Sequence, residues 1–184
     1  MAKYPDVNAG QTEACINRMG GWNNFLRYVG GSGRIVFDKI LKPLRDMAVG
    51  KYYAHTTSMK YFEGFLVKWV DDRFMSQFIG LEVPATSSAF LVVNNLEEPF
   101  SDAIIIAELG GELKAEISIT HFAEFLLRNK GLSVIFMCYL RGKNGNLSSV
   151  SGHWIVGPDR WRIQSRAVSG SRKIGAGVRV IAYK

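Results

Sequence analysis

The amino-acid sequence is typical of an α+β protein: a mostly antiparallel sheet, helices packed on one face, and an N-terminal helical hairpin. Two observations predict this class. Residues 132–184 consist of short β-prone segments separated by glycine-rich turns, and the preceding part carries apolar residues at helical spacing. A chain of 184 residues, with 47% hydrophobic and 21% charged residues, is long enough for one core and a small appendage.

Residues 1–33 are predicted to form the helical hairpin. Two short apolar segments within them each end at a glycine pair, which begins at Gly20 in the first and at Gly30 in the second. Glycine just past the last apolar residue is a common helix stop, because it adopts the left-handed conformation at little cost. We therefore expect a separate unit over 1–33 and an α+β domain over 34–184.

The middle of the chain mixes β-prone and helical patterns. Strands are predicted at residues 35–37, 49–55 and 89–93. Residues 39–47 have apolar positions that suit a helix, but Pro43 in their centre favours a loop or a broken turn. Residues 103–109 are apolar enough for a strand and could equally be helical.

Aromatic side chains at helical spacing predict three helices, over 59–69, 73–79 and 121–128. The first two are separated by Asp71-Asp72, which suits a helix cap, and Thr120 suits the cap of the third. We expect these aromatic rings to fill the core. The alternative is an oligomer surface or a partner groove formed by the first two helices.

A hairpin opens the strand block at 132–184. The segment 134–141 is apolar and ends at Gly142-Lys143-Asn144-Gly145, and Asn-Gly is a strong turn signal because both residues tolerate a positive φ. The return strand is predicted at 147–156, and a second turn follows it.

The next strand, over 160–168, alternates between two rows. Trp161, Ile163, Ser165 and Ala167 form one row, and Arg160, Arg162, Gln164 and Arg166 form the other. A period of two places these rows on opposite faces, so three arginines face solvent and Trp161 faces the core. A glycine-rich loop with Arg172 and Lys173 leads to a last strand at 178–183, predicted to complete an antiparallel meander.

Positive charge is concentrated in this strand block. Residues 132–184 contain nine lysines and arginines and the single acid Asp159, whereas residues 1–131 hold 14 bases and 15 acids. The formal net charge of +7 therefore belongs to the strand block. A basic surface of this kind attracts polyanions.

Several short motifs resemble those of a set of short uncharacterised bacterial proteins. That set has an N-terminal Glu-Ala-x-x-Asn-x-x-Gly-Gly hairpin, matched here from Glu13 to Gly21. The other matching motifs are Asp71-Asp72-Arg73-Phe74, Phe78-Ile79-Gly80, Ile105-Ile106-Ala107-Glu108-Leu109-Gly110-Gly111 and Gly177-Val178-Arg179-Val180. The resemblance implies an α+β fold with a separate N-terminal hairpin, and it transfers no catalytic residue because the group has no assigned activity.

Catalytic and cofactor motifs are scarce. The histidines His121 and His153 and the cysteines Cys15 and Cys138 lack the spacing of a metal site, and no serine stands in a Gly-x-Ser-x-Gly turn. The glycine-rich segments are neither a P-loop nor a dinucleotide fingerprint. We therefore predict no metal and no cofactor.

These observations favour a non-catalytic, cytoplasmic binding module for RNA, DNA or an acidic protein, without a membrane span. The predicted phosphate contacts are Arg160, Arg162, Arg166, Arg172 and Lys173. One alternative is a small hydrolase that uses His121 or His153 in a cleft between helix and sheet. The other is an oligomerising subunit that associates through the aromatic helices.

Overall fold

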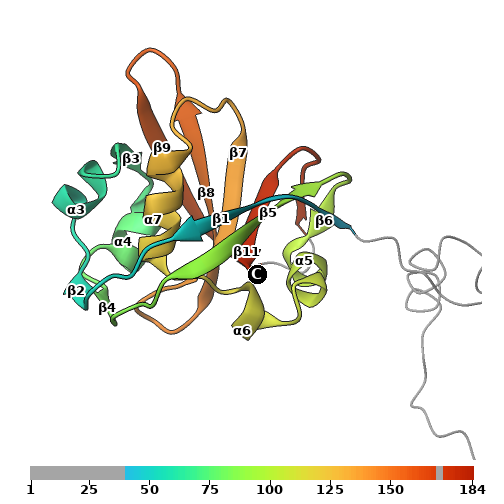
Figure 1. The fold of residues 1–184 in the computed structure, drawn as a ribbon, viewed down its shortest axis with the longest axis horizontal. Coiled ribbons are helices and arrows are strands. Elements are labelled where there is room, and N and C mark those ends of the chain that lie inside the picture. Colours follow the sequence, from blue (N-terminus) through green and yellow to red (C-terminus); the bar gives the residue numbers. More distant parts are fainter. Residues whose placement is uncertain (1–39, 169–171) are drawn as a thin grey trace, which may run out of the picture. The chain divides into compact units, whose positions relative to one another are not determined.

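The computed structural model describes residues 40–168 and 172–184, which form an α+β fold around one large sheet (Figure 1). The predicted N-terminal hairpin at 1–33 and the predicted first strand at 35–37 lie outside the described residues. The large sheet has seven strands in the order β1-β5-β11-β7-β8-β9-β3. Its strands are β1 (Leu41–Val49), β3 (Val67–Val70), β5 (Ala89–Leu96), β7 (Ile135–Arg141), β8 (Leu147–Ile155), β9 (Arg160–Ala167) and β11 (Arg179–Tyr183).

Two small sheets and five helices complete the described part. One small sheet pairs β2 (His55–Thr56) with β4 (Glu82–Val83), and the other pairs β6 (Phe100–Ser101) with β10 (Lys173–Ile174). The helices are α3 (Met59–Glu63), α4 (Asp72–Phe78), α5 (Asp102–Glu108), α6 (Glu112–Ala115) and α7 (Ile119–Arg128). No helix among the described residues is long and apolar enough to cross a membrane.

The large sheet is mostly antiparallel, as predicted. The β7–β8 hairpin forms where Asn-Gly predicts it: Gly145 has φ 75°, and Gly142 N–H donates to Asn146 O at 3.1 Å. The prediction that the last strand continues the meander is wrong, since β11 lies between β5 and β7 and runs parallel to β7. The centre of β11 is buried on both faces, which favours an interior place in a sheet over an edge.

Helices cover both faces of the sheet, so the expectation of helices on one face is wrong. Alternate residues of β7 show the division: Phe136, Cys138 and Leu140 pack in the cluster that contains α3, α4 and α7, and Met137 and Tyr139 pack with α5 and α6. We call the α7 side the first face and the α5 side the second face. Because β7 is apolar on both sides, each side requires a cover.

The cover of the second face is incomplete. In Figure 1, α5 and α6 lie on the side of the sheet near β11 and β6, and α7 crosses the region of β7, β8 and β9. The hydrophobic cluster on the second face contains buried residues of β1, β5, β7 and β11. From β8, β9 and β3, it contains only one buried residue, Leu147 at the start of β8. The second face of β9 consequently exposes Arg160, Arg162 and Gln164 to solvent.

Three segments differ locally from their predictions. The predicted strand at 49–55 does not form, because β1 ends at Val49 and β2 begins only at His55. The predicted helix at 59–69 ends after Glu63, Leu66 adopts a φ of 62°, and the chain then enters β3. Pro43 does not break the ambiguous segment at 39–47, because β1 is an edge strand whose register shifts between Pro43 and Arg45. An edge strand tolerates the missing N–H, which would interrupt hydrogen bonding inside a sheet.

Candidate functional site

The uncovered part of the second face forms a continuous surface over β3, β8 and β9, which we call the open sheet face. Its side chains are Trp69, Ser151, His153, Ile155, Arg160, Arg162 and Gln164. Trp161 and Ile163 are buried against the first face, so the alternate residues of β9 point to the second face. Direct pairing places Ser151 opposite Gln164, His153 opposite Arg162 and Ile155 opposite Arg160, and residues paired in this way share a face.

Trp69 and Arg162 form the most specific contact on the open sheet face. Strand β3 pairs with β9 so that Trp69 stands beside Arg162, and the guanidinium carbon lies 4.0 Å from the centroid of the indole ring. The cation is attracted to the electron-rich ring face, which restricts the arginine side chain. Trp69 is nevertheless 39% exposed, so part of the ring remains available to a ligand.

The helical spacing of Phe62, Phe65, Leu66 and Trp69 predicts a core position for Trp69, and this prediction is wrong because Trp69 is 39% exposed on β3. The local composition did carry a contrary signal: Val67-Lys68-Trp69-Val70 is rich in β-branched and aromatic residues, which favour strands. The positive φ of Leu66, which separates α3 from β3, is unusual for leucine and has no sequence signature.

A surface cavity of about 220 Å³ lies beside this contact. It is lined by Trp69, Ile155, Arg160 and Arg162, with a contribution from the otherwise buried Trp161. The guanidinium groups of Arg160 and Arg162 and the exposed ring of Trp69 thus border the same space. Such a lining suits a flat aromatic group that carries or adjoins negative charge.

The strands around the open sheet face contain no acidic residue. None of β3, β7, β8 and β9 includes Asp or Glu, as the printed sequence shows. The ion pairs of the described residues do not include Arg160 or Arg162. Arg141, at the end of β7, is instead paired with Glu116 at 2.8 Å. Arg160 and Arg162 therefore have no carboxylate partner among the described residues.

Arg166 is differently placed from the other two predicted arginines of β9. It is half-buried, and its Nη2 lies 3.9 Å from the Sδ of Met137 on the neighbouring hydrophobic surface. Within the described part of the chain, its Nε and the Oγ of the directly opposite Ser149 are both buried without a hydrogen-bond partner. Arg166 thus marks the inner border of the open sheet face.

Arg172 and Lys173 belong to a different element. Lys173 lies on β10 and pairs with Ser101 of β6, and Arg172 immediately precedes it. Of the five predicted contact residues, the structure brings Arg160 and Arg162 together at one cavity. It places Arg166 at the border and Arg172 with Lys173 on a separate small sheet.

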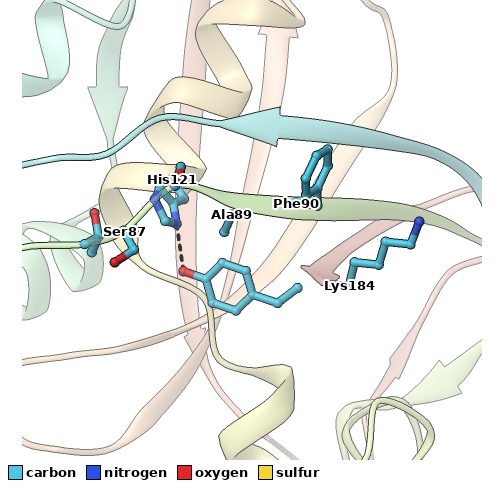
Figure 2. A pocket seen from close by; sticks show the side chains of 8 residues that line it. Ser87, Ala89, Phe90, His121 and Lys184 are labelled. Carbon is cyan, nitrogen blue, oxygen red and sulfur yellow. Dashed lines mark hydrogen bonds between the residues drawn. The ribbon is translucent and has the colours of Figure 1, made fainter.

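His121 is buried on α7 and hydrogen-bonded through both ring nitrogens. Figure 2 draws one of these two hydrogen bonds as a dashed line. Its Nε2 lies 3.0 Å from Gly50 O, and its Nδ1 lies 2.8 Å from Tyr183 Oη. Because the carbonyl only accepts, the hydrogen of a neutral ring is on Nε2, and Tyr183 donates to Nδ1. Ser118 N–H in turn donates to Tyr183 Oη at 2.9 Å. This arrangement leaves no ring nitrogen for proton transfer to a substrate.

The two histidines considered for hydrolysis lie on different faces. His121 borders a surface pocket of about 550 Å³ whose lining includes Ser87, Phe90 and Lys184 (Figure 2). His153 is exposed on the open sheet face opposite Arg162, so the expectation that it lies in a cleft between helix and sheet is wrong. Its position on β8 follows from the alternation that buries Trp154 on the first face.

Two observations concern thiol and metal chemistry within the described residues. Burial raises the pKa of the Cys138 thiol well above its usual value, which disfavours the reactive thiolate. No group of three or more His, Cys, Asp or Glu side chains among the described residues is arranged to hold a metal ion. Cys15 lies outside them.

Comparison with known proteins gives no match: no protein-family model, no curated protein and no solved structure matches the chain. The open sheet face combines cations without a carboxylate partner and an exposed aromatic ring, whereas the hydrogen-bonding groups of His121 are already engaged.

Proposed function

We propose that the chain binds a polyanion through the open sheet face, and that this polyanion is a nucleic acid. The observation that carries the proposal is the projection of Arg160 and Arg162, together with Trp69, from strands that contain no acidic residue. Arginines neutralise phosphates and release condensed counterions, which drives association. The exposed indole adds a surface on which a base can stack.

An acidic protein is the weaker ligand for this surface. Carboxylates would pair with the two guanidinium groups, but they offer no planar ring to match Trp69 and the adjoining cavity. Phosphates and bases satisfy both parts of the site. Lys173 would contact only a ligand that extends beyond the open sheet face, because it lies on the small sheet with β6.

Binding to single- and double-stranded RNA and DNA, titrated over a range of salt concentrations, tests this function. We expect binding at low salt that weakens steeply as salt rises. Replacing both Arg160 and Arg162 by glutamine should lower the logarithmic salt slope by roughly 1.4, since each lost phosphate contact contributes about 0.7 for a single strand.

Lys60 and Arg73 provide a matched control. Both are exposed and lie on α3 and α4, whose buried phenylalanines pack on the first face. Replacing both by glutamine removes two positive charges, as the Arg160/Arg162 double variant does. The protein's overall electrostatic field therefore weakens equally in the two variants, while the open sheet face stays intact in the control. Equal losses of affinity in the two double variants would contradict the proposal, as would the absence of binding to any nucleic acid at low salt.

A further inference from the structure

We infer that the ligand is single-stranded and that one unpaired base occupies the cavity of about 220 Å³, stacked against the Trp69–Arg162 pair. This inference rests on the proposed function and specifies its ligand. It assigns the cavity to the base and the outward surfaces of Arg160 and Arg162 to the adjoining phosphates.

The walls of the cavity suit a planar, uncharged ring. The guanidinium carbon of Arg162 lies over the Trp69 ring at 4.0 Å from its centroid, and the exposed part of the indole can accept a stacked base. Ile155 and Arg160 stand opposite one another and bound the same cavity. Its volume is below the roughly 300–1,000 Å³ of pockets that hold drug-sized ligands, so it accommodates a single ring system.

An exposed apolar side chain continues this surface beyond the cavity. Ile135 of β7 is 44% exposed and stands opposite His153. An apolar side chain in this position can contact the sugar or the ring face of a neighbouring nucleotide.

A regular duplex does not fit this geometry. In a duplex the ring faces are covered by neighbouring base pairs, and only base edges reach the grooves. Stacking on Trp69 therefore requires a base that is unpaired or has left its stack, which costs least in a single strand. The aromatic part of the site thus selects against the duplex, while the arginines alone would bind either form.

The test compares three probes: a short single-stranded oligonucleotide, the same oligonucleotide with its bases removed, and inorganic polyphosphate. Trp69→Ala should weaken binding of the intact oligonucleotide by about 5- to 150-fold, the range expected for the loss of one stacked base. It should leave binding of the abasic strand and of polyphosphate unchanged. Trp69→Phe retains an aromatic ring and should recover most of the affinity.

The outcomes separate this inference from the proposed function. If the Arg160/Arg162 double variant loses affinity for all three probes but Trp69→Ala binds each like the wild type, the inference fails and phosphate binding stands. If no probe binds the wild type at low salt, both the inference and the proposed function fail. A duplex of the same sequence serves as a further probe, and duplex binding as tight as single-strand binding overturns the inference. Circular dichroism confirms that each variant is folded.

Discussion

The hydroxyl of Tyr183 lies 2.8 Å from Nδ1 of His121 and ties the last strand of the sheet to helix α7. The same oxygen accepts the N–H of Ser118, the residue that caps α7. One side chain of β11 thereby fixes both the imidazole and the start of the helix. This network satisfies the hydrogen-bonding groups of a histidine that is buried on α7.

Replacing Tyr183 by phenylalanine should lower the free energy of unfolding by roughly 1–3 kcal/mol, because Ser118 N–H and His121 Nδ1 lose their partner. Urea denaturation measures the change. Tyr53→Phe is the matched control, since Tyr53 is 81% exposed and its replacement should change stability by less than about 0.5 kcal/mol. Equal stability of the two variants would show that the network contributes nothing.

Close approach between α7 and β8 makes Gly152 intolerant of a side chain. A Cβ at this position would lie 2.9 Å from Leu126 Cδ2 and 3.6 Å from Phe122 Cζ, both in the buried core. We expect Gly152→Ala to destabilise the protein by about 1–3 kcal/mol, as overpacking does. Gly175→Ala is the control, because nothing lies within 4 Å of its added Cβ. Thermal unfolding that ranks the two variants equally would contradict this close packing.

Asp71 joins helix α4 to the basic strand β9. Its Oδ1 accepts Phe74 N–H at 2.8 Å, and its Oδ2 accepts Ser165 N–H at 3.0 Å. Asp71→Ala removes both bonds and should lower the free energy of unfolding by at least the roughly 1 kcal/mol typical of a lost helix cap. Asp71→Asn keeps one acceptor oxygen and should fall between the alanine variant and the wild type in urea denaturation. An asparagine variant as unstable as the alanine variant would argue that the cap alone contributes little.

Stability should fall at alkaline pH through Tyr139. This residue is fully buried and donates to Asp102 Oδ1 at 3.0 Å, and burial, followed by the negative charge of Asp102, raises the pKa of Tyr139. In the unfolded chain the phenol loses its proton near pH 10. Above that pH the folded state binds more protons than the unfolded state, so the free energy of unfolding decreases as pH rises.

Urea denaturation at pH values of about 9 to 11 tests this dependence. Tyr139→Phe has no phenolic proton at this position, so its stability should decline less steeply with pH than that of the wild type. Parallel slopes for the two proteins would assign the alkaline loss of stability to other groups.

The parts of the fold that follow from local pattern were predictable. The strict alternation of β9 placed Arg160 and Arg162 opposite Trp161, and the structure shows Trp161 buried with its indole N–H donating to Leu126 O at 3.0 Å. The Asn-Gly turn likewise defined the β7–β8 hairpin. Both patterns depend only on residues close together in the chain.

The parts of the fold that depend on contacts between residues far apart in the chain were not predictable from the sequence. The place of β11 between β5 and β7 follows from pairing with strands far away in the sequence, and no local signal encodes it. Trp69 reached the open sheet face because α3 ends early and β3 pairs in parallel with β9. The arginine half of the candidate site was therefore predictable from the sequence, whereas the place of Trp69 beside Arg162 depended on pairing between strands far apart in the chain.

Photo-crosslinking of a short single-stranded oligonucleotide, followed by mass spectrometry of the crosslinked peptides, tests the central claim most directly. We expect crosslinks in β3, β8 and β9, including Trp69, that disappear at high salt. Crosslinks confined to α3, α4 and α7, or none at low salt, would contradict the assignment of nucleic-acid binding to the open sheet face.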